Sequence, residues 1–301
     1  MLGRFLDSDV FYSFRRNPLA VGSAIVLACI LIGSVFSPWL APTNPFDLAS
    51  LNVMDSFNPP AFMPNGARAN LLGTDEQGRD VLSSIMYGTR VSLFVGVLAV
   101  AFAITLGVTV GLVAGYLGGF VESVLMRITD VQLSFPSILI ALLVDGIARA
   151  VLPRELHNEL ELYVLIFAIG ISGWPQFART VRGSTMVERG KEYVMAARVI
   201  GIGSARIMFS HILPNVLGPV LVIATLSLGQ AILAEATLSF LGVGLPPTEP
   251  SLGTLIRIGQ NFLLSGEWWV TIFPGVALAL MVLAINLLGD WLRDALNPRL
   301  R

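Results

Sequence analysis

Long stretches without a charged side chain constrain this sequence more than any other feature. Residues 19–40 contain no Asp, Glu, Lys or Arg, and neither do residues 91–121. A helix needs about 20 apolar residues to cross the hydrocarbon core of a bilayer. Because lipid offers no partner to backbone polar groups, an open chain can cross it only as helices. The sequence therefore predicts an all-α polytopic membrane protein.

The apolar stretches favour six transmembrane helices. We place them at residues 19–40, within 92–116, and at about 125–144, 162–178, 214–242 and 268–289. Pro136 is expected to kink the third span, and the Gly-Trp-Pro run at 173–175 is expected to break the fourth near its end. Glycines at 107, 111 and 115 of the second span have a spacing that allows close helix packing. Packing within the chain is a simpler explanation of that spacing than a dimer contact.

The distribution of basic residues indicates how the spans are oriented. With six spans and an inner N-terminus, 13 of the 19 Lys and Arg residues lie inside, which agrees with the positive-inside rule. This orientation gives a cytoplasmic N-terminus at 1–18, an extracytoplasmic loop at 41–91 and a five-helix core at 92–291. A loop at 179–215 and the tail at 292–301 then lie in the cytoplasm, so both termini are expected there.

A polar stretch at 191–215, KEYVMAARVIGIGSARIMFSHILPN, interrupts the apolar second half of the chain. Helix formers continue to Ile200, glycines at 201 and 203 follow, and a second helical run comes after them. This pattern predicts a helix-turn-helix in the cytoplasm.

Sequence motifs for self-contained catalysis are missing. The sequence contains no GxxxxGK[ST] phosphate loop, no HExxH and no GxSxG. The two histidines, His157 and His211, lie far apart, and Cys29 is a single cysteine. We therefore expect no enzyme, no catalytic residue, and no bound cofactor or metal. Transport is the remaining class, driven by an ion gradient or by another subunit.

Ionisable residues at membrane depth are few. Glu235 in the fifth span and Asp130 and Pro136 in the third are candidates for a translocation pathway or gate. For Glu235, pairing within the helix bundle is an alternative to a role in the pathway.

Several motifs together resemble a known family. Glu192, the alanines at 196 and 197, Gly201 and the Leu-Pro at 213–214 resemble the EAA loop of bacterial ABC importer permeases. Met195 stands at the core glutamate position, and Glu192 lies one turn earlier. Further matches run at 72–80, 87–93, 115–119, 135–137, 238–242 and 289–298. Together they resemble the dipeptide/oligopeptide/nickel permease family, and within it the C-type membrane subunit.

The resemblance implies the type I ABC importer permease fold in the bacterial inner membrane. It implies as partners a second homologous permease, two cytoplasmic ATPases that bind ATP and Mg²⁺, an extracytoplasmic binding protein and the lipid bilayer, but no nucleic acid. The EAA-like loop would then dock on an ATPase. The docking residues would be Glu192, Ala196, Ala197, Arg198, Gly201, Gly203, Arg206, Leu213 and Pro214.

Other functions remain open at the level of sequence. Within the family the cargo could be a di- or oligopeptide, nickel, an opine or glutathione. Outside it, the chain could be an independent ion-coupled carrier or a membrane anchor. Arg79 and Asp80 precede the second span on the outer side, where they could contact the binding protein, gate entry or cap a helix.

Overall fold

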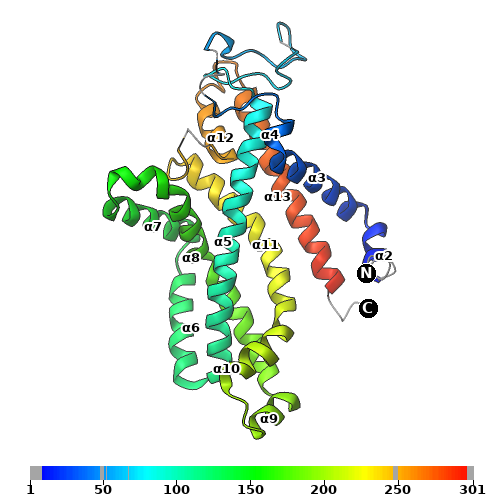
Figure 1. The fold of residues 1–301 in the computed structure, drawn as a ribbon, viewed down its shortest axis with the longest axis vertical. Coiled ribbons are helices and arrows are strands. Elements are labelled where there is room, and N and C mark those ends of the chain that lie inside the picture. The colour runs from blue at the N-terminus through cyan, green and yellow to red at the C-terminus, as the bar shows by residue number, and fades with distance from the viewer. Residues whose placement is uncertain (1–8, 48–50, 52, 67, 247–249, 297–301) are drawn as a thin grey trace.

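The molecule is almost entirely helical, with the longest helices running side by side (Figure 1). The structure is a computed structural model that describes residues 9–47, 51, 53–66, 68–246 and 250–296. Within these residues the only β-type pairing is an isolated bridge between Thr74 and Asp80. The predicted all-α class is confirmed.

Five helices are long and apolar enough to cross a membrane, or six spans result if one bent pair is counted. The five are α3 (Pro18–Val35), α5 (Val81–Leu117), α8 (Arg154–Arg189), α11 (Leu213–Phe240) and α13 (Trp269–Leu296). The shorter elements are α2 (Asp9–Arg16), α4 (Ser37–Leu40), a 3-10 turn (Val53–Asp55), α9 (Glu192–Val199), α10 (Ser204–Arg206), a π-helical turn (Ile207–Ile212) and α12 (Leu252–Gln260).

The bent pair replaces the predicted third span. α6 (Gly119–Leu133) and α7 (Ser137–Val151) meet at an angle of 93°, and α7 projects to the side of the bundle (Figure 1). The predicted single helix over 125–144 with a kink at Pro136 is therefore wrong, because two separate helices meet there at a much larger angle than a kink. Pro136 has an extended backbone, which no helix residue adopts. The helix therefore stops before Pro136, and a new helix starts after it in another direction. The expected loop at 145–161 shrinks to two residues, because α7 reaches Val151 and α8 begins at Arg154.

Helix α8 passes through the Gly-Trp-Pro run instead of breaking there. A proline at 175 cannot donate to the carbonyl of Ile171, so that acceptor loses its helical partner. The side-chain amide of Gln132 on α6 donates to this carbonyl, and its oxygen accepts from Trp174 Nε1 at 2.9 Å. Because a neighbouring helix supplies the missing donor, the helix remains continuous.

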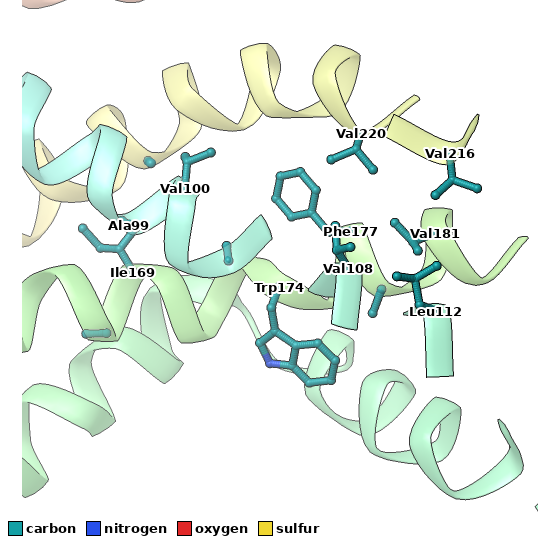
Figure 2. Packing of buried hydrophobic residues seen from close by; sticks show 14 of the residues in the cluster. Ala99, Val100, Val108, Leu112, Ile169, Trp174, Phe177, Val181, Val216 and Val220 are labelled. Carbon is teal, nitrogen blue, oxygen red and sulfur yellow. The ribbon is translucent and has the colours of Figure 1, made fainter. Parts of the chain in front are cut away.

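Close packing of α5 against α8 forms the centre of the core. A Cβ at Gly107 would lie 2.5 Å from Phe177 Cβ, and one at Gly111 would lie 2.7 Å from Val181 Cβ. Gly115 similarly faces Thr185. The glycine spacing thus serves packing within the chain, as predicted. Figure 2 shows Phe177 between this helix pair and α11, beside Val220.

The described residues between α4 and α5, which are expected on the outer side, form an outer loop held against α13. Asp75 Oδ1 accepts from the backbone N–H groups of Gln77 (2.8 Å) and Arg79 (2.9 Å), and Trp269 Nε1 donates to the carbonyl of Thr74 (3.1 Å). Gly73 has a φ of +82°, which favours glycine. The second outer loop, expected at 243–267, contains helix α12, which the sequence analysis missed.

Candidate coupling surface

Helix α9 lies at the end of the molecule opposite the outer loop (Figure 1) and is anchored by one of its faces. Val194 is fully buried and Ala197 is 4% exposed. The helix ends in a Schellman motif, because Gly201 N–H donates to Arg198 and Ile202 N–H donates to Ala197. Gly201 has a φ of +82°, so glycine is needed for this turn. The predicted helix-turn-helix is therefore present, with the turn at Gly201.

A hydrogen-bond network around Tyr193 ties α9 to both flanking helices. Tyr193 Oη donates to Glu188 Oε2 at 2.6 Å and accepts from Asn215 Nδ2 at 3.1 Å. Lys191 Nζ also pairs with Glu188 at 2.5 Å. Burial and the hydrogen bond to Glu188 raise the pKa of Tyr193, which therefore stays protonated as the donor. The network joins the end of α8 to the start of α11 through α9, and sequence reasoning missed it.

The C-terminal end of α5 provides a second anchor for α9. The guanidinium of Arg198 lies over the ring of Tyr116 at 4.9 Å, and Arg189 Nη1 donates to the Tyr116 carbonyl at 3.0 Å. Arg198, one of the expected docking residues, therefore stacks on its own chain and is still exposed. Arg206 ends α10 and is exposed.

The exposed side of α9 is apolar with one acidic end. Val199 is 87% exposed, Ile200 74% and Met195 49%. Glu192 and Ala196 are also exposed. We call these five residues, Glu192, Met195, Ala196, Val199 and Ile200, the coupling face. Exposed apolar side chains that lie together are typical of interaction sites, so this face is a candidate for one. Val199 and Ile200 were missed, although their apolar character beside the glycine turn is a signal that the sequence carries.

The structure corrects one predicted docking residue and one glycine of the predicted turn. Ala197 packs inward, so only Ala196 of the alanine pair allows a partner to approach. Gly203 has a φ of −63° and no atom within 4 Å of an added Cβ, so the turn does not require glycine there. Leu213 and Pro214 begin α11 directly after the π-helical turn and connect the loop to that span.

The three candidates for the translocation pathway do not contact a common site. Glu235 is fully buried and accepts from Ser92 Oγ (2.7 Å) and Ser239 Oγ (2.8 Å), so the structure favours the alternative of pairing within the bundle. Asp130 forms an ion pair with Arg179 of α8 at 2.6 Å and is exposed. Pro136 lies at the bend before α7.

Arg79 and Asp80 are both buried, which removes the surface expected at these positions. Asp80 Oδ2 accepts from Ser83 N–H at 2.8 Å and Ser83 Oγ at 2.7 Å, so it caps the N-terminus of α5. The capping alternative is therefore the correct one for Asp80, and the expected contact with a binding protein is not supported at either residue.

Comparison with known proteins decides the family. The model of the family described as "Binding-protein-dependent transport system inner membrane component" matches residues 107–301. The chain belongs to this family. A second model, the "N-terminal TM domain of oligopeptide transport permease C", matches residues 7–60 of this inner membrane component.

Named relatives cover nearly the whole permease. It is 43% identical to the dipeptide transport system permease protein DppC of Escherichia coli K12, over 97% of this chain and 93% of that protein. It is 37% identical to the di/tripeptide transport system permease protein DppC of Pseudomonas aeruginosa UCBPP-PA14, over 97% of this chain and 92% of that protein.

The fold agrees with a solved structure of an ABC importer. A chain of the MetNI methionine ABC transporter, in an inward-facing conformation, superposes with a TM-score of 0.55 at 19% identity. The match covers 71% of this chain and 96% of that one. The predicted ABC importer permease fold is confirmed, and the chain is an inner membrane protein. Among the described residues, no group of three or more His, Cys, Asp or Glu side chains could hold a metal ion.

Proposed function

We propose that this chain is the permease subunit of an ABC importer that moves di- or oligopeptides into the cytoplasm. The coupling face on α9 is the observation that carries the proposal, because it offers an apolar, exposed helix at one end of the bundle. The two relatives described above carry dipeptide or di/tripeptide transport in their names, which supports the cargo.

The proposal requires a motor outside this chain. Two ATPase subunits bind ATP and Mg²⁺ in the cytoplasm, and one of them receives α9 in a cleft. A second, homologous permease completes the membrane part, and a binding protein delivers peptide to the outer side. Both termini and α9 are cytoplasmic in this arrangement, as the charge distribution indicates.

Movement of α9 can reach the membrane spans through two connections. The Tyr193 network links α9 to α8 and α11, and the π-helical turn at Ile207–Ile212 leads directly into α11. Turns of this kind frequently occur at functional sites. A displacement of α9 by the ATPases would thus shift α11 as a rigid body.

Replacement of Gly201 tests the coupling role. A Gly201→Glu substitution puts a side chain on a left-handed residue at a cost of about 1–2 kcal/mol and displaces the end of α9. In a reconstituted complex we expect dipeptide uptake and binding-protein-stimulated ATP hydrolysis both to fall by about tenfold or more. The subunit should still co-purify with the second permease.

Two controls separate coupling from folding. Gly201→Asn tolerates a left-handed backbone and should retain most of the uptake. Gly203→Ala removes a nearby glycine that the turn does not require, and should have no effect. Unchanged uptake in the Gly201→Glu complex would contradict the proposed docking of α9.

A further inference from the structure

A small hollow with both apolar and polar lining residues lies at the middle of the helix bundle. It has a volume of about 80 Å³ and lies between α5, α8 and α11 beside the start of α7. The residues that line it fall near the midpoints of the three long helices, so the hollow is at the depth of the bilayer centre. Alanines and a glycine, at 99, 103, 173, 231 and 234, leave the space open.

Five neutral polar side chains converge on this hollow. They are Ser137, Ser172, Gln176, Ser227 and Gln230. The bend at Pro136 brings the first of them there, because Ser137 is the first residue of α7. The other four come in pairs on one face of α8 and one face of α11. Within the described ranges, no charged residue lines the hollow.

The two glutamines have no partner in the part of the chain that the structure describes. Both are exposed, and neither side-chain amide forms a hydrogen bond there. An amide in hydrocarbon without a hydrogen bond costs several kcal/mol. Polar groups at this depth face protein or a water-filled cavity instead of lipid. The face that carries Gln176 and Gln230 must therefore meet water, cargo or another protein chain.

We infer that this face is the wall of the translocation pathway that contacts the peptide backbone, an assignment that rests on the proposed function. A glutamine amide both donates and accepts, so it matches the N–H and C=O groups that every peptide bond carries. A neutral lining also accepts peptides of either charge, because it offers no fixed charge to repel them. Glu235 and Asp130 do not line the hollow, and each already has a partner elsewhere in the chain.

Alanine substitutions test the contact in the complete complex, reconstituted with its second permease, ATPases and binding protein. We expect Gln176→Ala and Gln230→Ala each to lower the uptake of dialanine by about 3- to 10-fold. Binding-protein-stimulated ATP hydrolysis should continue, because the coupling face is untouched. Uptake equal to wild type in the double variant would overturn the inference.

A charged side chain of the same shape should change the preference for peptide charge, which a merely structural role would not do. Gln230→Glu keeps the shape of the side chain and adds a negative charge. Uptake of diglutamate should fall by about tenfold more than uptake of dilysine. Equal losses for both peptides would contradict a peptide contact and indicate a structural role.

Cysteine accessibility decides between an aqueous pathway and a protein interface. In a Cys29→Ser background, Gln176→Cys and Gln230→Cys should react with a charged, membrane-impermeant thiol reagent, and dialanine should slow the reaction. Leu283→Cys, at the midpoint of α13 and exposed, is the matched control and should not react. Unreactive cysteines at 176 and 230, or variants that fail to bind the second permease, would make this face a subunit interface and overturn the inference.

The proposed function and this inference can fail separately. If the wild-type complex does not import dialanine, the proposed function fails. If it does, but the variants show no uptake defect and no reaction, only the assignment of the pathway wall fails.

Discussion

At the residue scale, Asp80 shows how one side chain can be both favourable and costly. Its Oδ2 caps α5 through Ser83, yet its Oδ1 is buried and has no hydrogen-bond partner among the described residues. Burial raises the pKa of Asp80, although the hydrogen bonds from Ser83 oppose this. The cap therefore stabilises the helix while the buried charge reduces that benefit at neutral pH.

Removal of the cap should destabilise the protein more than removal of its charge. We expect Asp80→Ala to lower the free energy of unfolding by about 1 kcal/mol, because Ser83 N–H loses its acceptor. Asp80→Asn keeps an acceptor and should lose less. Thermal unfolding of the detergent-solubilised protein measures both, and equal losses would contradict the capping role.

Comparison of Asp80→Asn with the wild-type protein should also reveal a pH dependence of stability. Because the folded-state pKa of Asp80 is raised, its contribution to stability is present below the unfolded-state pKa, about 4. That contribution is lost as the pH rises through the folded-state pKa. The stability of Asp80→Asn relative to wild type should therefore increase between about pH 4 and pH 7.

Individual residues also show the limit of sequence reasoning. The alanines at 196 and 197 both match the EAA pattern, and the glycines at 201 and 203 both lie in the predicted turn. Only the direction of α9 against the bundle separates exposed Ala196 from buried Ala197. Likewise, only the backbone angles separate Gly201 from Gly203.

At the element scale, α8 depends on a side chain from another helix. Gln132 donates to the Ile171 carbonyl that Pro175 leaves open, and it also accepts from Trp174. One glutamine thus compensates for the proline and fixes α6 against α8.

A double-mutant cycle tests this compensation. Gln132→Leu should lower the free energy of unfolding by about 1–3 kcal/mol, because two polar groups lose their partner. Pro175→Ala restores the backbone donor, so Gln132→Leu should cost less in that background. Thermal unfolding of the four proteins gives the coupling energy, and additive losses would rule out the compensation.

Elements with regular apolar patterns were predictable, and those that depend on distant partners were not. The glycine spacing in α5 and the apolar stretches of α3, α11 and α13 identified those helices. The continuity of α8 could not be predicted, because Gln132 lies 39 residues before Ile171. The 93° bend after α6 was underestimated, since a proline alone does not determine the angle.

At the scale of the whole molecule, the compact outer loop and the coupling face occupy opposite ends (Figure 1). The positive-inside rule assigns the α9 end to the cytoplasm. This orientation predicts that only the end with the outer loop is accessible from outside the cell.

Labelling of single cysteines tests this orientation. In a Cys29→Ser background, an impermeant maleimide should label Leu264→Cys in intact spheroplasts, because Leu264 is 98% exposed in the second outer loop. Ser204→Cys, exposed on α10, should be labelled only after the membrane is permeabilised. Labelling of Ser204→Cys in intact spheroplasts would contradict the orientation.

Helix α5 joins these two ends without interruption. It begins at the Asp80 cap in the outer loop and ends beside Tyr116, where Arg189 and Arg198 attach. Its 37 residues form a strut about 55 Å long. If one end is held, a tilt of only about 5° displaces the other by about 5 Å. A small tilt near Tyr116 is thus magnified into a larger displacement at the Asp80 end of the helix, at the opposite end of the molecule.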